Sequence, residues 1–404
     1  MKFMKFKNLQ LNFKVTENEI QFKAECGEKT AIICDLRDGI LYINTLYSFK
    51  ENPITVSGKA QCGDEAILKI FDFKIELYIN GKLVDEEWPC GSNFLGGAKY
   101  SIKNTEIEFS EAELPKKDEM RVLYTFKNAE GWKPEGDIFV GDCMPYFDDG
   151  RYHVIYLYDR HHHGSKWGLG AHQWAHISTD DFETWQAHPM MVDISEHWEG
   201  SICTGSHIKK GDVHYLYYTV RMYDLSPAPI RRSISYDGYH YEKDTDFGFC
   251  LSYDYDTRSA RDPKVIQTDD GVYHMFITTT SAKLGKGCLA HLTSTDLDNW
   301  VEEEEPIYVS PDECQPECPD YFKAGDYYYL VFSHYGKGQY LYSKKPLSDW
   351  QKPDLTTIPC KSVPKSALWK DKIIFTGFNG EGLYAGTMTF RTAHVGEDGQ
   401  LVFE

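Results

Sequence analysis

Apolar and polar residues alternate along most of the chain with a period of two, the spacing typical of β-strands. Five segments share one pattern, in which a polar turn precedes a run of aromatic, β-branched and aliphatic residues. These segments open at Asp149-Gly150, Lys210-Gly211, Asp270-Gly271, Ala324-Gly325 and Lys370-Asp371. Dipeptides such as Asp-Gly before such runs are signals of β-hairpins. Long apolar stripes with helical spacing are absent from the sequence, so the pattern predicts an all-β protein.

A second motif follows most of these copies and ends at an aromatic residue. It reads Ser178-Thr179-Asp180 with Trp185, Ser294-Thr295-Asp296 with Trp300, Ser343-Lys344-Lys345 with Trp350 and, more weakly, Ser235-Tyr236-Asp237 with Tyr241. We interpret it as a third strand, a turn and an aromatic residue that opens an outer strand. Successive hairpin signals lie between 46 residues (324 to 370) and 61 residues (149 to 210) apart. Several strands within such a period are typical of a propeller blade, so the five copies predict a five-bladed β-propeller.

Residues 1–115 lack this repeat and alternate in short runs instead. One pair of runs turns at Asn80-Gly81, a strong hairpin signal. Short strands with turn signals predict an antiparallel β-sandwich of the jelly-roll or lectin-like kind. The polar stretch from Glu111 to Met120 is typical of a linker. We therefore predict an N-terminal antiparallel β-sandwich over residues 1–117, followed by a five-bladed propeller over residues 118–404.

The formal net charge of −19 narrows the range of partners. It disfavours nucleic acid and anionic membrane surfaces, and it suits a small neutral ligand such as a carbohydrate. Aromatic residues make up 15% of the chain, which is typical of strands and also of surfaces that stack on sugar rings. The sequence shows no transmembrane or signal-peptide pattern, and its 11 cysteines are scattered. We expect a cytoplasmic protein with free thiols and without a cofactor; the oligomeric state is left open.

Three carboxylates occupy the same place in three copies of the repeat. Asp142, Asp262 and Glu317 lie eight, nine and eight residues before the hairpin glycine of their copies. In the other two copies this position is occupied by Cys203 and Ser362. The first strand of each propeller blade lines the central channel, so the three acids are expected to converge on one spot. Crowded carboxylates raise one another's pKa and resist burial, and the chemistry that requires such a set is glycoside cleavage.

The neighbours of these acids predict different protonation states. Each acid is followed within three residues by a proline, which suits an irregular strand start. Arg261 beside Asp262 is expected to keep that carboxylate ionised. Glu317, next to Cys318 and Pro319, is expected to be buried with a raised pKa, as a proton donor requires.

Several of these segments resemble motifs of glycoside hydrolase family 32, the β-fructosidases, which include invertases, levanases, inulinases and sucrose-6-phosphate hydrolases. Arg261-Asp262-Pro263 resembles the family's Arg-Asp-Pro motif, and Glu317-Cys318-Pro319-Asp320 resembles its Glu-Cys motif. Trp167-Gly168 and the stretch from Trp174 to Trp185 resemble its first-blade tryptophan motifs, and Thr204-Gly205-Ser206 resembles its Ser-Gly-Ser in the second blade. The resemblance covers about residues 137–340.

The resemblance implies a retaining mechanism through a covalent fructosyl-enzyme ester. It implies that Asp142 is the nucleophile, Glu317 the acid/base and Asp262 the transition-state stabiliser that holds fructose hydroxyls. The family's first motif is Trp-Met-Asn-Asp-Pro-Asn-Gly, whereas residues 140–145 keep the aspartate and lose the flanking asparagines. Those asparagines contact the sugar in the family, so the terminal-sugar subsite is expected to differ. The family's sandwich is C-terminal, whereas the predicted sandwich of this chain precedes the propeller.

Further residues are candidates for the surroundings of the substrate. The indoles of Trp167 and Trp198 are candidates for stacking on sugar faces, whereas Trp174 is expected in the core. The histidines at 161–163 would point to opposite faces of a strand and so could not chelate together, and we predict no metal site. The complete set of predicted substrate-binding residues is Arg261, Trp167, Trp198, Asp159, Arg160, Thr204 and Cys318.

We therefore predict a retaining glycoside hydrolase that cleaves terminal β-fructofuranosyl linkages of small fructose-containing oligosaccharides, by hydrolysis or by fructosyl transfer. One alternative is an inverting propeller hydrolase that acts on arabinosides or xylosides. Its carboxyl groups would lie about 6.5–9.5 Å apart, compared with about 5–5.5 Å in a retaining enzyme. Another alternative is a carbohydrate-binding propeller without turnover, which three acids at one repeated position disfavour.

Overall fold

The computed structural model describes the chain except for residues 1, 4–7, 18, 48–52, 89–92, 96–97, 103–105, 114–122, 163–171, 197, 223, 225 and 381. The chain forms two compact units. Unit 1 comprises Met1–Lys116 together with Ser165–Ala171 and Ile194–Ser201, and unit 2 comprises Lys117–Gly164, His172–Asp193 and Ile202–Glu404. The described residues contain strands and no helix, which confirms the all-β class, and among them there is accordingly no helix suited to crossing a membrane.

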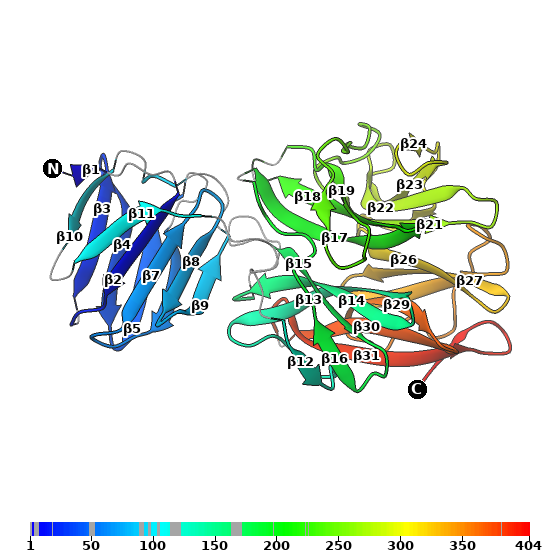
Figure 1. The fold of residues 1–404 in the computed structure, drawn as a ribbon. Helices are drawn as coiled ribbons and strands as arrows, with labels where there is room; N and C mark the ends of the chain where they lie inside the picture. Colours follow the sequence, from blue (N-terminus) through cyan, green and yellow to red (C-terminus); the bar gives the residue numbers. More distant parts are fainter. Residues whose placement is uncertain are drawn as a thin grey trace. The chain divides into compact units, whose positions relative to one another are not determined.

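Unit 1 is built from two antiparallel sheets (Figure 1). The first sheet has the order β1-β10-β3-β4-β5-β6, with strands at Lys2–Phe3, Lys99–Ile102, Ile20–Cys26, Lys29–Arg37, Ile40–Thr45 and Ile54–Lys59. The second has the order β11-β2-β7-β8-β9, with strands at Ile107–Glu111, Leu9–Lys14, Glu65–Ile70, Ile75–Ile79 and Lys82–Glu87.

The two sheets of unit 1 share one hydrophobic core. In β2, Leu9, Leu11 and Phe13 are buried, whereas the residues between them are more exposed. This period of two gives the strand one apolar face, and the same pattern in the other strands supplies the remaining core. The β8–β9 hairpin turns at Asn80 and Gly81, whose φ values of 49° and 76° are those of a type I′ turn. The Asn-Gly hairpin prediction is therefore confirmed.

The described strands of unit 2 form five antiparallel blades in chain order. Blade 1 contains β13–β16 at Ile138–Asp148, Arg151–Arg160, Gln173–Thr179 and Thr184–Ala187, with β12 at Thr125–Lys127 added at its outer edge. Blade 2 contains β17–β20 at Glu199–Lys210, Val213–Met222, Ile230–Ser235 and Glu242–Lys243. Blade 3 contains β21–β25 at Arg261–Gln267, Tyr273–Ser281, Lys286–Ser294, Val301–Glu302 and Tyr308–Val309. Blade 4 contains β26–β28 at Glu317–Ala324, Tyr327–His334 and Lys337–Ser343. Blade 5 contains β29–β32 at Ser362–Trp369, Lys372–Gly380, Gly386–Val395 and Leu401–Phe403.

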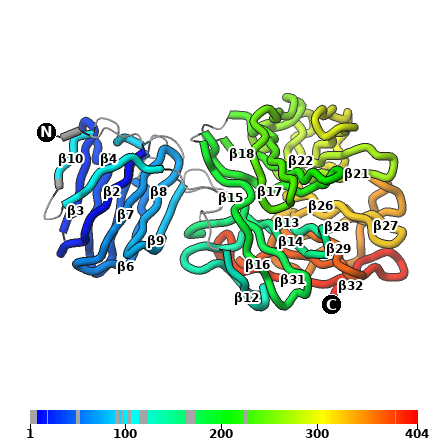
Figure 2. Tube along the Cα trace, viewed as in Figure 1, coloured from blue at the N-terminus to red at the C-terminus, as the bar shows by residue number. Residues whose placement is uncertain are grey.

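The last blade lies beside the first and closes the ring. Gly386 of β31 pairs with Val140 of β13. The backbone of Met388 accepts a hydrogen bond from the amide of Gly131 and donates one to the carbonyl of Trp132, both at 2.8 Å. Figure 2 shows the red C-terminal strands next to those of the first blade. The predicted five-bladed propeller is therefore the architecture of unit 2, and its radial repetition leaves only short sheet edges.

The predicted turns of the repeat are also found. Asp149 and Gly150 have φ values of 46° and 75°, and their hairpin joins β13 to β14. The second motif forms a turn held by side chains: the Asp296 carboxylate accepts hydrogen bonds from the amides of Asp298 and Asn299, both at 2.8 Å. These are local interactions of Asp and Gly with their own backbone, which is why the sequence predicts them well.

Candidate active site

The inner strands of four blades carry a β-bulge at a corresponding place. The register with the second strand shifts between Val140 and Cys143, Arg261 and Lys264, Glu317 and Asp320, and Ser362 and Lys365. A bulge places two residues opposite one residue of the partner strand and redirects their side chains. The bulged pairs are Gly141-Asp142, Asp262-Pro263, Cys318-Pro319 and Val363-Pro364.

These bulges show that the three acids do not share one position in the repeat. Asp142 is the second bulged residue, Asp262 is the first, and Glu317 precedes its bulge. The expectation of strict equivalence is therefore wrong. The number of residues between an acid and its hairpin glycine does not give the position of the acid relative to the bulge. The paired segment between bulge and hairpin differs in length, since it spans residues 143–148 in blade 1 but only 264–267 in blade 3.

Two bulged residues, one of them an acid, have a left-handed backbone. The φ values of Asp262 and Cys318 are 58° and 53°. Residues other than glycine seldom adopt this conformation, which costs of the order of 1–3 kcal/mol at each position. The prolines that follow, Pro263 and Pro319, have no amide to donate and so suit a place where the ladder is broken. The backbone here is arranged to direct side chains and not to continue the sheet.

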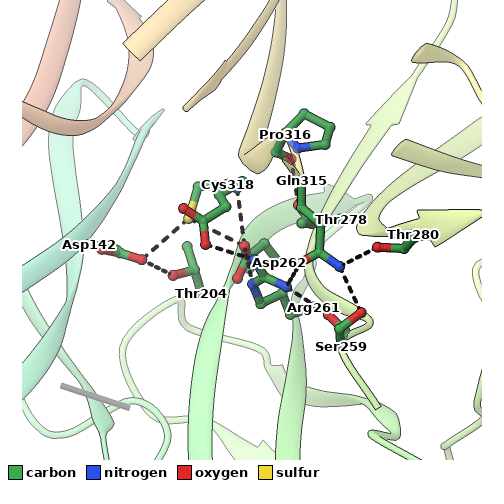
Figure 3. A network of polar contacts seen from close by, with 12 residues as sticks. Asp142, Thr204, Ser259, Arg261, Asp262, Thr278, Thr280, Gln315, Pro316 and Cys318 are labelled. Atoms are coloured by element: carbon green, nitrogen blue, oxygen red, sulfur yellow. Dashed lines mark hydrogen bonds and ion pairs between the residues drawn. The ribbon is translucent and has the colours of Figure 1, made fainter. Parts of the chain in front are cut away.

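Asp142 is buried, and both of its carboxylate oxygens accept hydrogen bonds. Oδ2 accepts from the hydroxyl of Thr204 at 2.6 Å and from the thiol of Cys318 at 3.3 Å (Figure 3). Oδ1 accepts from the hydroxyl of Tyr384 at 2.9 Å. Hydrogen bonds to an ionised acceptor are stronger than neutral ones, so these donors hold the carboxylate in one orientation.

Cys318 connects Asp142 to Asp262. Its thiol lies 3.4 Å from Oδ2 of Asp262, and its backbone amide donates to the same oxygen at 3.1 Å. Burial raises the pKa of the Cys318 thiol well above its ordinary value, so the thiol stays protonated and able to donate. Burial also raises the pKa of Asp262, against the opposing charge of Arg261. Arg261 lowers this pKa as expected, but desolvation of the enclosed carboxyl outweighs it, so the expected net lowering is wrong.

Arg261 in turn connects Asp262 to Glu317. Its Nη2 lies 2.7 Å from Oε1 of Glu317, and its Nε lies 3.6 Å from Oδ2 of Asp262. The side chain of Glu317 is 45% exposed, so the predicted burial of this acid is wrong. Glu317 is held by a guanidinium on one side and open on the other, which leaves its carboxyl group accessible.

Arg261 is itself held by a polar network. Its Nη1 donates to the carbonyl of Ser259 at 2.8 Å and to Oε1 of Gln315 at 2.6 Å. The amide nitrogen of Gln315 donates to the hydroxyls of Ser259 and Thr280, each at 2.8 Å (Figure 3). The guanidinium is therefore fixed before any substrate arrives.

A second charged network follows the bulges of blades 3, 4 and 5. Nζ of Lys264 lies 2.6 Å from Oδ1 of Asp320, and the amide and hydroxyl of Ser366 donate to Oδ2 at 2.7 and 2.9 Å. Although desolvation opposes it, the ammonium groups of Lys264 and Lys365 lower the pKa of Asp320. Nζ of Lys365 donates to the carbonyl of Gly205 at 2.9 Å, and burial lowers the pKa of this lysine. These paired charges tie together the strands that present the acids.

The chain matches the family described as glycosyl hydrolases family 32 N-terminal domain over residues 142–354, more than half of its length. It belongs to this family. The matched range contains all three acids, the Cys318 bridge and the Arg261 network, whereas Tyr384 and Lys365 lie beyond it.

Individual relatives agree with this membership. The chain is 29% identical to raffinose invertase of Escherichia coli over 200 residues, which cover 47% of this chain and 40% of the relative. It is 29% identical to sucrose-6-phosphate hydrolase of Escherichia coli over 225 residues, which cover 53% and 43%. The chain thus spans less than half the length of these curated relatives. The crystal structure of fructan 1-exohydrolase IIa from Cichorium intybus aligns with a TM-score of 0.57 at 16% identity, over 69% of this chain and 60% of that one, a likeness of fold alone.

Of the predicted substrate-binding residues, Arg261, Thr204 and Cys318 lie in the network of the acids. Asp159 and Arg160 end β14 and are buried, with exposed fractions of 0% and 5%. Oδ1 of Asp159 lies 2.7 Å from Nε2 of His172. The structure therefore gives Asp159 no exposed surface and makes it a support for other side chains.

The predicted tryptophans fall into three cases. Trp167 lies outside the described residues. Trp198 is half-buried and lies just before β17, in the segment Ile194–Ser201 that belongs to unit 1. Trp174 is fully buried in unit 2, and its indole donates to the carbonyl of Cys203 at 2.9 Å, which confirms its prediction as a core residue.

The histidine run does not continue a strand as assumed. His161 and His162 form a turn with φ values of 55° and 57°, and His163 lies outside the described residues. The ring of His162 stacks on Phe139 at a centroid distance of 3.5 Å, and its Nδ1 lies 2.9 Å from the carbonyl oxygen of Tyr384. Over the part of the chain that the structure describes, no group of three or more His, Cys, Asp and Glu residues is suited to a metal ion.

Three residues of the site were not predicted from the sequence: Tyr384, His172 and Lys365. Tyr384 lies in the loop between β30 and β31, in a blade whose inner strand contributes no acid, so the repeat did not point to it. One signal was available, namely Gly141, which stands where the family motif has asparagine. A Cβ atom at Gly141 would lie 2.8 Å from the hydroxyl of Tyr384.

Proposed function

We propose that the chain is a retaining glycoside hydrolase that releases terminal β-fructofuranosyl residues from small fructose-containing oligosaccharides. The observation that carries this proposal is the single network in which Cys318 and Arg261 join the carboxyl groups of Asp142, Asp262 and Glu317. Membership of family 32 supports the reaction class. The names of the relatives, an invertase and a sucrose-6-phosphate hydrolase, support a fructose-containing substrate.

In the first step of the proposed mechanism, Asp142 attacks the anomeric carbon of the fructosyl unit. The bond from that carbon to the leaving oxygen breaks, and Glu317 gives its proton to this oxygen. In the second step Glu317 takes a proton from water, the water attacks the same carbon, and Asp142 leaves as a carboxylate. The accessibility of Glu317 supports this role, because it must meet the leaving group and then water.

Asp262 is the proposed stabiliser of the transition state. A carboxylate held by the amide of Cys318 and by Arg261 is fixed in place and can accept hydrogen bonds from fructose hydroxyls while positive charge develops on the ring. Because burial raises the pKa of Asp262, we expect activity to fall on the acidic side at a higher pH than an ordinary aspartate would give.

We assign this activity to the propeller over residues 118–404 and assign no catalytic role to the sandwich over residues 1–117. We further propose a cytoplasmic location. The described cysteines support it, since all of them are unpaired, as expected of a reducing compartment.

The test is a substrate screen with a stereochemical readout. Sucrose, sucrose 6-phosphate, raffinose, inulin and levan are incubated with the protein in the presence of methanol, and products are followed by NMR. Retention predicts methyl β-fructofuranoside, which does not mutarotate. An inverting enzyme would give no such β-product, and turnover of arabinosides or xylosides in place of fructosides would favour the pentoside alternative. Binding of sugar without any turnover would favour the non-catalytic propeller.

A further inference from the structure

We propose that Tyr384 is a positioning residue for Asp142, whose carboxylate it orients for attack and stabilises as the leaving group of the second step. This inference rests on the proposed function of the propeller. It concerns a residue of blade 5 that lies outside the range matched by the family.

The hydrogen bonds between the two residues run in both directions. The hydroxyl of Tyr384 donates to Oδ1 of Asp142 at 2.9 Å, and the backbone amide of Asp142 lies 3.3 Å from the same hydroxyl oxygen. The amide occupies a lone pair of that oxygen, which directs the hydroxyl proton toward the carboxylate. The pair therefore forms a closed local ring of hydrogen bonds.

The hydroxyl of Tyr384 keeps its proton. Desolvation, together with the charges of Asp142 and Asp159, raises the pKa of Tyr384 well above its ordinary value. A tyrosine that stays neutral over the working range of pH acts as a hydrogen-bond donor and not as a base. Its contribution is therefore orientation and charge stabilisation.

Neighbouring side chains fix the ring of Tyr384. It stacks on His172 at a centroid distance of 5.3 Å and meets Phe378 edge-on at 5.3 Å. His172 is anchored by Asp159, and the carbonyl of Tyr384 is held by His162. Asp159, which has no exposed surface, thus holds the histidine ring that supports the tyrosine.

The backbone beside Asp142 leaves room for the hydroxyl. A Cβ atom at Gly141 would lie 2.8 Å from the oxygen of Tyr384 and 3.0 Å from Cβ of Leu157. Real Cβ contacts are almost never this short, so any side chain at this position would displace the hydroxyl or the strand. Gly141 and Tyr384 are thus matched to each other.

The two steps of the reaction respond differently to loss of the hydroxyl. Asp142 is a carboxylate before the first step and again after the second, and between them it is a neutral ester. A donor to the carboxylate stabilises that charged state more than the ester. Removing the donor should therefore slow hydrolysis of the intermediate more than its formation.

The experiment compares Tyr384→Phe with wild type on sucrose. We expect kcat to fall about 10²-fold, the lower end of the loss that follows removal of one donor to a developing charge. KM should fall with it because the intermediate accumulates, so kcat/KM changes less than kcat. Glucose should appear with a burst, and mass spectrometry after an acid quench should show a fructosyl adduct on the protein. A structural role alone would produce none of these changes.

Tyr217→Phe is the matched control. The hydroxyl of Tyr217 donates to the carbonyl of Leu297 at 2.7 Å between blades 2 and 3, and the residue is fully buried. Its loss should lower thermal stability, by an amount typical of one buried hydrogen bond, and leave kcat and KM unchanged.

Gly141→Ala tests the same contact without removing the tyrosine. It should reproduce the fall in kcat and KM, and in the Tyr384→Phe background it should add little. If the losses in kcat of Gly141→Ala and Tyr384→Phe multiply in the double variant, the inference is overturned. It is also overturned if Tyr384→Phe has unchanged kcat and KM while Asp142→Asn is inactive. Full sucrose hydrolysis by Asp142→Asn would overturn the proposed function itself. If Tyr384→Phe fails to fold, Gly141→Ala alone decides, because unchanged kinetics there would contradict the proposal.

Discussion

The inner hairpins of the propeller carry enclosed ionisable groups at both ends, and the two ends differ in kind. At the start of the inner strands, carboxylates of blades 1, 3 and 4 meet a guanidinium, a thiol and hydroxyls. At the hairpin end of blades 1 to 3, the histidine three residues after the hairpin glycine pairs with a second histidine. The pairs are His153 with His176, His214 with His207 and His274 with His291, at nitrogen distances of 2.9, 3.0 and 2.9 Å.

The two rings of each histidine pair share a hydrogen bond that does not require a charged ring. Burial lowers the pKa of His153 and of His291 to about 4, and lowers that of His207 well below its ordinary value. Each pair therefore contains at least one ring that is neutral near pH 7 and can accept a hydrogen bond from the other ring. At this end of the hairpins the histidine rings therefore have a structural role, as packed and hydrogen-bonded side chains.

The carboxylate end is paired differently. Asp142 and Asp262 share one thiol, and among the described residues Arg261 is the cation in direct contact with Asp262 and Glu317. Of the three acids, Glu317 keeps an exposed carboxyl group that a ligand can contact. The comparison teaches that the way an enclosed ionisable group is paired, and not burial itself, separates a reactive cluster from a structural one.

The largest effect is expected at Asp142, near the start of β13, and Asp148 at the end of the same strand is its control. Asp142→Asn should lower kcat for sucrose by about 10⁴-fold or more, because the nucleophile is lost. Asp148→Asn should leave kcat nearly unchanged and lower stability by about 1 kcal/mol or less, since it only weakens a partly exposed pair with Lys209. Kinetics and thermal unfolding of both variants check this. Equal losses of activity would erase the distinction between the two ends.

A smaller loss is expected when the cation of the acid end is altered. Arg261→Lys should lower kcat by about 10²-fold, because lysine keeps the charge but not the planar set of donors that reaches Glu317, Gln315 and Ser259 together. The control is Arg232→Lys in blade 2, where Arg232 pairs with Asp244 and Asp298. We expect that variant to lose stability and keep its activity; the reverse outcome would contradict the assignment.

The histidine end should appear in the pH dependence of stability. The folded-state pKa of His153, about 4, lies below the ordinary value of 6.5 because of burial, so the unfolded chain binds the proton more readily between these values. Stability is thus full above about pH 6.5 and falls as the pH is lowered toward 4, by about 2–3 kcal/mol for this residue.

Urea unfolding of the wild type at pH 7 and at pH 4.5, compared with His153→Gln, measures this contribution. The variant should show a shallower dependence on pH, because one titrating group is missing. Nearby Asp148, Arg151 and His214 also influence His153 and are unchanged in the comparison. An identical slope in both proteins would show that His153 is not buried as a neutral ring.

The smallest effect is expected from the turn itself. Gly150→Ala adds a Cβ into open space, but at a φ of 75° that non-glycine residues seldom adopt. We expect a loss of about 1–2 kcal/mol in unfolding free energy and unchanged kcat. A change in KM or kcat would mean that the hairpin end communicates with the acids.

The fold could be predicted where interactions are local. The turns at Asn80-Gly81 and Asp149-Gly150 and the Ser/Asp motif after the third strand depend on residues a few positions apart. The buried position of Trp174 followed from its place in a strand pattern. The three acids were identified from their recurrence and from the family motifs, and they do lie in one network.

Errors arose wherever an answer depended on segments far apart in the chain. Glu317 was expected to be buried because of its sequence neighbours, yet Arg261 and open space surround it. The pKa of Asp262 was expected to follow its neighbour Arg261, yet enclosure by Cys318 and the surrounding blades decides its direction. Tyr384 was missed because it reaches Asp142 from a loop 242 positions away.

The sequence by itself determined the class of structure, since alternation and turn residues act between near neighbours and repeat five times. It also pointed to Asp142, Asp262 and Glu317, which the structure joins in one network. Only the tertiary structure decided how those side chains meet, because the three acids stand at different positions relative to the bulges of their strands and closure of the ring brings blade 5 against blade 1. Exposure, protonation and orientation depend on those long-range contacts, which no local pattern encodes.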